Sequence, residues 1–167
     1  MAEEMLMKTA WIAAIATGLM AIGGASARRA GAGPDTAKKE IETFNQKFID
    51  AHLKMDNAAI MSLWADDGVS LLPELAPMVG KKTIAGFLDD VIARMPGYHM
   101  GKFEIEFQGL ETNGEWASEW ATEHQVVAAP PGKENFEGYG EMLLVLHKEA
   151  DGNWRITREM WNQGIKP

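Results

Sequence analysis

Cysteine is absent from this chain, and basic residues are outnumbered by acidic ones. Without cysteine no disulfide, thiolate metal site or lipid-attached cysteine can form, so packing alone must stabilise the fold. The net charge of −8 argues against nucleic acid and anionic membranes as partners. No Gly-x-Ser-x-Gly elbow, glycine-rich phosphate loop or metal-binding histidine spacing occurs. We therefore expect neither a metal nor a cofactor.

The first thirty residues differ in composition from the rest of the chain. Lys8 precedes an apolar run rich in alanine and glycine, which ends at the small residues Ala-Ser-Ala, 25–27. This order is typical of a secretory signal peptide, and the run is short of the ~20 strongly apolar residues of a membrane-spanning helix. The acidic residues before Lys8 fit poorly, so translation from a later methionine stays an alternative. We expect a periplasmic or secreted protein, divided into a signal peptide, a flexible leader, one domain and a tail, at 1–27, 28–35, 36–163 and 164–167.

Apolar residues recur at helical spacing in three segments of the N-terminal half. The first segment has an apolar stripe that includes Phe48 and His52. Asp56 provides a capping side chain for a second helix, which the sequence predicts to end at Gly68. A third helix follows a proline-marked loop and ends at Pro-Gly, 96–97.

From Lys102 onward the apolar residues alternate with polar ones, as in half-exposed strands. Three turn signals divide this half of the chain, the first of them Asn-Gly at 113–114. They predict four antiparallel strands, near 102–111, 115–128, 134–148 and 153–163. Helices followed by strands predict a single α+β domain.

Three stretches carry a resemblance to a known family. They are residues 44–72, the helix start VGKKTI at 79–84, and EMLLVLHKEADGNWRITREMWN at 141–162. Together they resemble the SnoaL-like group of the nuclear transport factor 2-like superfamily, which includes ketosteroid isomerase. The resemblance implies a cone-shaped, curved and mainly antiparallel sheet wrapped around three N-terminal helices, with a pocket between them. It specifies a scaffold rather than a chemistry, because this fold hosts many functions.

Two positions of the resemblance depart from ketosteroid isomerase. When the Phe-Ala-Asp-Asp of the isomerase is laid over residues 64–67, its oxyanion-stabilising tyrosine falls on Phe48 and its carboxylate base on Leu72. Neither side chain can donate or carry a proton. We therefore expect no isomerisation by the tyrosine and aspartate route.

The predicted strand over 115–128 places Trp120 and His124 on one face, which we expect to be a pocket wall. The equivalent face of the next strand holds Tyr139 and Glu141. A buried glutamate near a histidine can act as an acid/base pair, so His124 and Glu141 are the candidate catalytic residues. A purely structural role for both is the alternative. The predicted ligand-binding residues are Phe48, His52, Trp64, Leu72, Trp120, Tyr139, Met160 and Asn162.

Two functions remain open. The first is a secreted module that binds a small apolar or aromatic metabolite in its pocket. The alternative is a cofactor-free SnoaL-like enzyme that works by proton transfer, as an isomerase, cyclase or dehydratase. Two titratable side chains converging in a closed cavity would favour the enzyme. A third and weaker hypothesis is an interaction domain.

The strand over 134–148 contains the run Met-Leu-Leu-Val-Leu at 142–146, which is apolar on both of its faces. One face must contact the helices. The other predicts a homodimer through the outer face of the sheet. Cover by the tail or the leader is the alternative.

Cleavage after Ala27 predicts a mature protein that begins at Arg28. N-terminal sequencing of the exported protein checks this, and a mature form that still contains Trp11 would contradict it.

Overall fold

The computed structural model describes residues 34–166. The predicted signal peptide and most of the predicted leader lie outside the described residues. The helices are α2 (Pro34–Leu53), α3 (Asn57–Ser62) and α4 (Lys81–Ala93). Helix α2 therefore already includes the last two residues assigned to the leader. Asp56 caps α3 as predicted, because its side chain accepts a hydrogen bond from the Ala59 amide at 2.9 Å.

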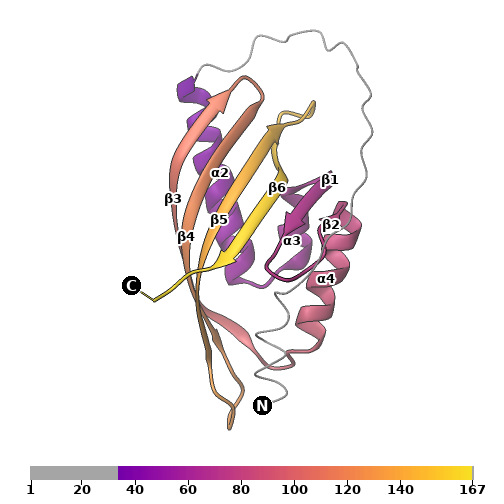
Figure 1. Cartoon of the computed structure of the whole chain (residues 1–167), viewed down its shortest axis with the longest axis vertical. Helices are drawn as coiled ribbons and strands as arrows, with labels where there is room; N and C mark the ends of the chain where they lie inside the picture. The colour runs from indigo at the N-terminus through magenta and orange to yellow at the C-terminus, as the bar shows by residue number, and fades with distance from the viewer. Residues whose placement is uncertain (1–33, 167) are drawn as a thin grey trace.

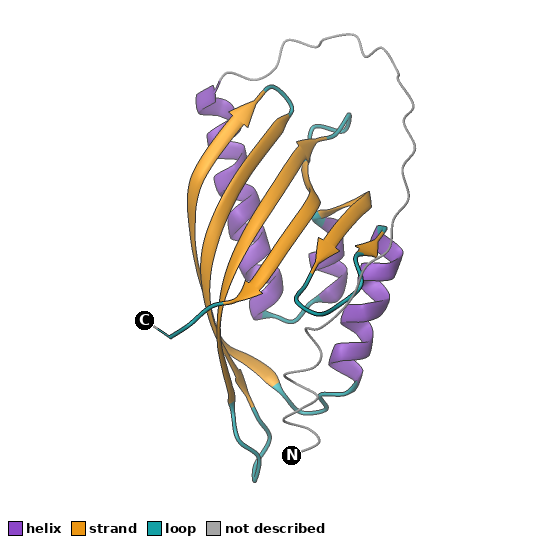
Figure 2. Cartoon of the chain, in the orientation of Figure 1, coloured by secondary structure: helices purple, strands orange, loops and turns teal. Residues whose placement is uncertain are grey.

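The six strands form one sheet behind which the helices lie (Figures 1 and 2). They are β1 (Trp64–Leu71), β2 (Met78–Val79), β3 (His99–Asn113), β4 (Trp116–Ala128), β5 (Phe136–Lys148) and β6 (Trp154–Gln163). Their order is β2-β1-β6-β5-β4-β3, and every pairing is antiparallel except that of β1 with β6. The α+β fold with a curved, mainly antiparallel sheet is therefore confirmed, and the four C-terminal strands lie close to their predicted bounds. No described helix is long and apolar enough to cross a membrane.

The predicted end of the second helix at Gly68 is wrong. Strand β1 already begins at Trp64, and Gly68 lies inside it. A side chain at Gly68 would lie 2.7 Å from the Trp64 ring and 3.2 Å from the carbonyl oxygen of Ile156 on β6. The glycine is there because the strand, the indole and the neighbouring strand approach one another closely.

The predicted inward face of β4 is also wrong. Its buried positions hold Ala117, Glu119, Ala121 and Glu123, so Trp120 and its face neighbours point outward. Helix α2 packs over this face, where Asn45 reaches Glu119. Small side chains on the sheet let the helix approach closely, and the large indoles are therefore placed on the opposite face.

A bulge in β6 changes which residues face the core. Val145 pairs with Arg158, but the next residue, Leu146, pairs with Ile156, so Thr157 is the extra residue. Trp154 and Ile156 before the bulge and Trp161 after it are all buried. An uninterrupted strand would place the two tryptophans on opposite faces.

Asn45 and Glu119 form a polar pair in the core. Glu119 is 2% exposed, and its Oε2 accepts a hydrogen bond from Asn45 Nδ2 at 3.0 Å. The other two oxygens of the pair, Asn45 Oδ1 and Glu119 Oε1, are buried without a partner in the described structure. Burial raises the pKa of Glu119 to about 7, against the opposing hydrogen bond from Asn45. A proton on Glu119 would supply the donor that both oxygens lack.

This pair makes stability depend on pH. Because the pKa of Glu119 is higher in the folded state, stability falls as pH rises from about 4.5 through about 7. Glu119→Gln replaces the proton by an amide, so it should raise the free energy of unfolding by about 1–3 kcal/mol at about pH 8 and change it little at about pH 4.5. Urea unfolding at both pH values checks this.

The exposed Glu111→Gln on the neighbouring strand is the control and should have no such pH-dependent effect. Destabilisation by Glu119→Gln at about pH 8 would contradict the protonated pair.

Candidate functional site

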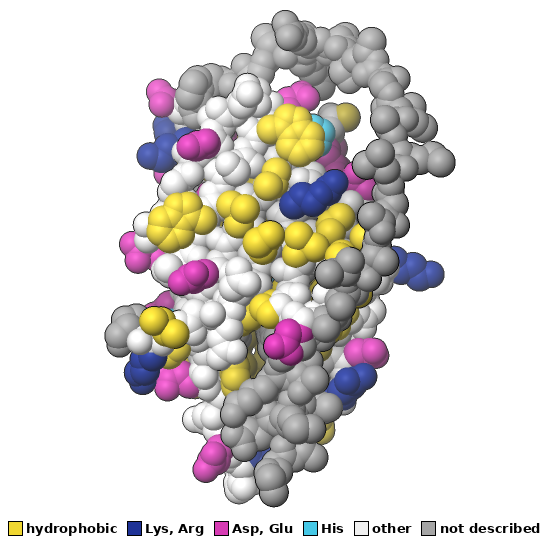
Figure 3. Space-filling model, viewed as in Figure 1, with side chains coloured by type: hydrophobic (Ala, Val, Ile, Leu, Met, Phe, Trp, Pro, Cys, Tyr) yellow, Lys and Arg dark blue, Asp and Glu magenta, His cyan; other side chains and the backbone are white. Residues whose placement is uncertain are grey.

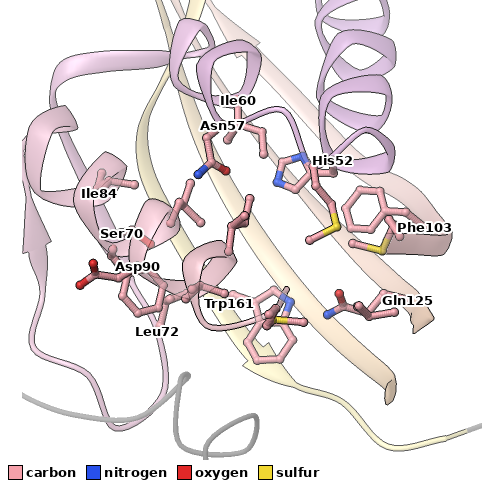
Figure 4. A pocket seen from close by; sticks show the side chains of 18 of the residues that line it. His52, Asn57, Ile60, Ser70, Leu72, Ile84, Asp90, Phe103, Gln125 and Trp161 are labelled. Carbon is pink, nitrogen blue, oxygen red and sulfur yellow. The ribbon is translucent and has the colours of Figure 1, made fainter. Parts of the chain in front are cut away.

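A cavity of about 330 Å³ lies between the three helices and the concave face of the sheet (Figure 4). Its volume is at the lower end of the range for small-molecule sites. Most of the side chains that line it are apolar, and several are aromatic or methionine. The aromatic ones are Phe48, Trp64, Phe87, Tyr98, Phe103, Phe136 and Trp161.

Two carboxyl groups from different strands line this cavity. Glu123 on β4 is 8% exposed, and its Oε2 accepts a hydrogen bond from Trp161 Nε1 at 3.2 Å. Glu159 on β6 accepts a hydrogen bond through Oε2 from the hydroxyl of Ser70, on β1, at 2.6 Å. Each carboxyl is thus held by a donor from another strand of the sheet, which restricts its orientation.

Both carboxyl groups have a raised pKa. Burial raises the pKa of Glu123 to about 7; the Trp161 hydrogen bond opposes this, and the negative charge of Glu159 adds to it. Burial likewise raises the pKa of Glu159, against the hydrogen bond from Ser70. Burial therefore disfavours ionisation of both carboxyls, and the charge of Glu159 further disfavours ionisation of Glu123.

Trp161 reaches Glu123 because no side chain stands between them. Gly140 pairs with Glu123 across β4 and β5. A Cβ atom at Gly140 would overlap the Trp161 indole around its Nε1 atom. The glycine therefore makes room for the indole that holds Glu123.

His52 contributes a neutral imidazole to the cavity. Its Nδ1–H donates to the Phe48 carbonyl oxygen at 2.8 Å, and burial lowers its pKa to about 4. Its ring lies against Phe48 and is stacked on Phe103. Figure 4 shows His52 and Phe103 together at one end of the cavity. Among the described residues, no group of three or more histidines or carboxylates could hold a metal ion.

Comparison with known protein families shows which family this chain belongs to. The model of the SnoaL-like domain matches residues 36–159, more than half of the chain. The chain belongs to the SnoaL-like family. No curated protein is similar enough in sequence to count as a relative of this SnoaL-like domain.

Solved structures share the fold at low sequence identity. A ketosteroid isomerase-like protein from Erwinia carotovora atroseptica is 22% identical, with a TM-score of 0.65 over 77% of this chain and 96% of that one. A proposed dehydratase of the NTF2-like family from Streptomyces avermitilis is 16% identical, with a TM-score of 0.68 over 80% and 100%. A proposed aromatic ring hydroxylase from Novosphingobium aromaticivorans is 18% identical, with a TM-score of 0.62 over 81% and 94%. At these identities the likeness shows the fold alone.

Four predicted site residues line the cavity of the SnoaL-like domain: Phe48, His52, Trp64 and Leu72. The other six point to the outer face of the sheet, because β4 and β5 present the opposite face to the helices and the bulge shifts β6. They are Trp120, His124, Tyr139, Glu141, Met160 and Asn162. Their predicted place in the pocket wall is wrong.

On this outer face His124 lies beside Tyr139, but no hydrogen bond joins it to Glu141 among the described residues. His124 pairs with Tyr139 in register, and their rings stack with centroids 4.4 Å apart. His124 Nε2 lies 2.9 Å from an oxygen of Glu137, also on β5. Glu141 pairs with Thr122 and Asn162 on the same outer face.

Sequence reasoning missed both cavity carboxylates. The signal for Glu123 was the spacing of Ala117 and Ala121, two small residues of the kind that a closely packed helix requires. Glu159 gave no comparable signal, since its direction depends on the bulge at Thr157.

Proposed function

We propose that this SnoaL-like domain is a cofactor-free enzyme that moves protons on a small apolar or aromatic compound. The observation that carries the proposal is the presence of two carboxyl groups with raised pKa, Glu123 and Glu159, in one largely apolar cavity. Pairs of titratable groups perturbed by burial are characteristic of acid/base sites.

The two carboxyls supply both halves of a proton transfer. The ionised one removes a proton from a substrate carbon, and the protonated one delivers a proton to a substrate oxygen or to another carbon. In an isomerisation the number of protons on the substrate is unchanged. In a dehydration the protonated oxygen leaves as water. Such general acid–base catalysis typically contributes about 10²–10⁴-fold in rate.

The second candidate function is binding of a small apolar or aromatic compound without chemical change, because most side chains that line the cavity are apolar or aromatic. The proposed dehydratase from Streptomyces avermitilis, which has the same fold, supports the enzyme. In either case we propose that the domain works in the periplasm or outside the cell, as the composition of residues 1–27 suggests.

A proton-transfer site should exchange carbon-bound hydrogen with solvent. In D₂O near neutral pH the protein should accelerate exchange of the α-hydrogens of at least one member of a panel of uncharged aromatic ketones, followed by proton NMR. Glu123→Gln should lower the rate by at least about a hundredfold, because its amide cannot exchange a proton with substrate carbon. The rate should fall at low pH, where both carboxyls are protonated, and at high pH, where both are ionised.

Glu141→Gln is the matched control. It removes a carboxyl from the outer face of the sheet and should leave exchange unchanged. Equal rates for wild type and Glu123→Gln would contradict the enzyme. A compound retained in native mass spectrometry without any exchange would favour the binding module.

We also propose a homodimer through the outer face of the sheet. Hydrophobic side chains gather there over β4, β5 and β6 (Figure 3). Trp120, Leu143 and Met160 pair in one row across these three strands and are 45%, 43% and 44% exposed. Trp116, half exposed on β4, extends the patch. A second copy with the same face would cover it by two-fold symmetry.

A charge in this row should separate the two copies. Leu143→Glu should give a monomer in light scattering at micromolar concentration, where the wild type gives twice the monomer mass. The positions Met142, Leu144 and Leu146 of the same strand are buried and do not serve this test. Val79→Glu, an exposed apolar position outside the row, is the control. A monomeric wild type would contradict the dimer.

A further inference from the structure

The end of the cavity formed by His52 has a fixed hydrogen-bonding character. The imidazole cannot turn freely, because its ring centroid lies 4.1 Å from that of Phe48 and 4.9 Å from that of Phe103. The Phe103 ring is stacked, with an angle of 7° between the two planes. Two aromatic neighbours and one hydrogen bond to the helix thus set the plane of the ring.

The same hydrogen bond sets the tautomer. A carbonyl oxygen can only accept, so the Nδ1 atom of His52 must carry the proton in its 2.8 Å bond to Phe48. A neutral imidazole with Nδ1 protonated has a lone pair on Nε2. The bond to Phe48 is the only hydrogen bond of this ring within the described part of the chain. In Figure 4 the other nitrogen of His52 points away from α2, toward the side of the cavity where Asn57 and Ile60 lie.

The interior of the cavity is unsuitable for an anion. Besides His52, the ionisable groups of the sheet and of α2 and α3 that line it are the carboxyls Glu123 and Glu159, of which Glu123 is buried. The cations in its lining are at the exposed rim: Arg94 ends helix α4 beside Asp90, and Lys133 lies over the Tyr98 ring. A negatively charged ligand would lose its hydration and meet like charge inside.

The geometry points to His52 as the residue that selects the ligand, by accepting a hydrogen bond from the hydroxyl group of an uncharged aromatic compound such as a phenol or an enol. This inference names the substrate class of the cavity on which the proposed function rests. The ring of the ligand would lie among the aromatic side chains, and its hydroxyl would pair with Nε2. Without that hydroxyl the Nε2 lone pair would be buried unpaired, which disfavours apolar analogues.

Three probes of similar shape test the selection: 2-naphthol, 2-fluoronaphthalene and 2-naphthoate. Isothermal titration calorimetry near neutral pH should show 2-naphthol binding to the mature protein at least about tenfold more tightly than 2-fluoronaphthalene, and no binding of 2-naphthoate. His52→Phe retains the aromatic stack but has no acceptor. It should reduce the preference for 2-naphthol to within about twofold while 2-fluoronaphthalene still binds. His99→Phe, at an exposed position of β3, should retain the wild-type preference.

A measurement on the wild-type protein tests the inference without relying on the His52→Phe variant. Nitrogen-15 NMR of the His52 ring should show the neutral form protonated at Nδ1, and 2-naphthol should shift the Nε2 resonance. A ring protonated at Nε2, equal binding of 2-naphthol and 2-fluoronaphthalene, tight binding of 2-naphthoate, or binding of none of the three overturns the inference.

These results are separate from the proton-transfer experiment. Glu123→Gln should lose hydrogen exchange and still prefer 2-naphthol, since the selecting atom is on α2 rather than on β4. If exchange occurs but no preference for the hydroxyl is found, the substrate class is wrong and the enzyme stands. If the preference is found without exchange in the wild type, His52 selects a ligand that is held and not transformed.

Discussion

The bulge at Thr157 is the feature on which both the core and the cavity depend. Before it, Trp154 and Ile156 face the helices; after it, Glu159 and Trp161 do so. Without the extra residue, the second pair would point to the outer face, because side chains alternate along a strand. The cavity would then lose one of its carboxyls and the indole that holds the other. Because of this one inserted residue, a single strand contributes both to the packed core and to the lining of the cavity.

The concave face carries acidic groups at a cost to stability. Glu119 and Glu123 lie four residues apart on β4, and burial raises the pKa of both to about 7. Each pKa unit corresponds to about 1.4 kcal/mol, so at high pH these groups oppose folding on the order of a few kcal/mol. Apolar packing around Ile41, Leu144 and Ile156, all nearly fully buried, offsets this. Only Glu123 lines the cavity; Glu119 is paired with Asn45 beneath α2.

The periodicity of the sequence was enough to predict the helices and the four long strands, and three stretches of the sequence carried the resemblance to the SnoaL-like family. It was not enough to orient the strands. Trp120 and Tyr139 resemble pocket residues, because aromatic side chains usually favour burial. They lie instead on the outer face of the sheet, which is also apolar. Phe48 and His52 were placed correctly, since a helix has one apolar stripe and that stripe must face the sheet. When a strand has apolar residues on both faces, its pattern does not tell which face points to the core. The bulge at Thr157 is not visible in the sequence either.

The cavity therefore has the scaffold of the SnoaL-like family, but its polar groups are not at the positions that the resemblance to ketosteroid isomerase implies. The two positions that would hold the tyrosine and the base of ketosteroid isomerase, Phe48 and Leu72, line the cavity as apolar walls. Its carboxyls instead come from the sheet, at Glu123 and Glu159. These carboxyls are held by side chains of other strands, Glu123 by Trp161 and Glu159 by Ser70, rather than by a loop. In the proposed proton transfer the carboxyls would act from the sheet, and His52 on α2 would serve as a neutral acceptor.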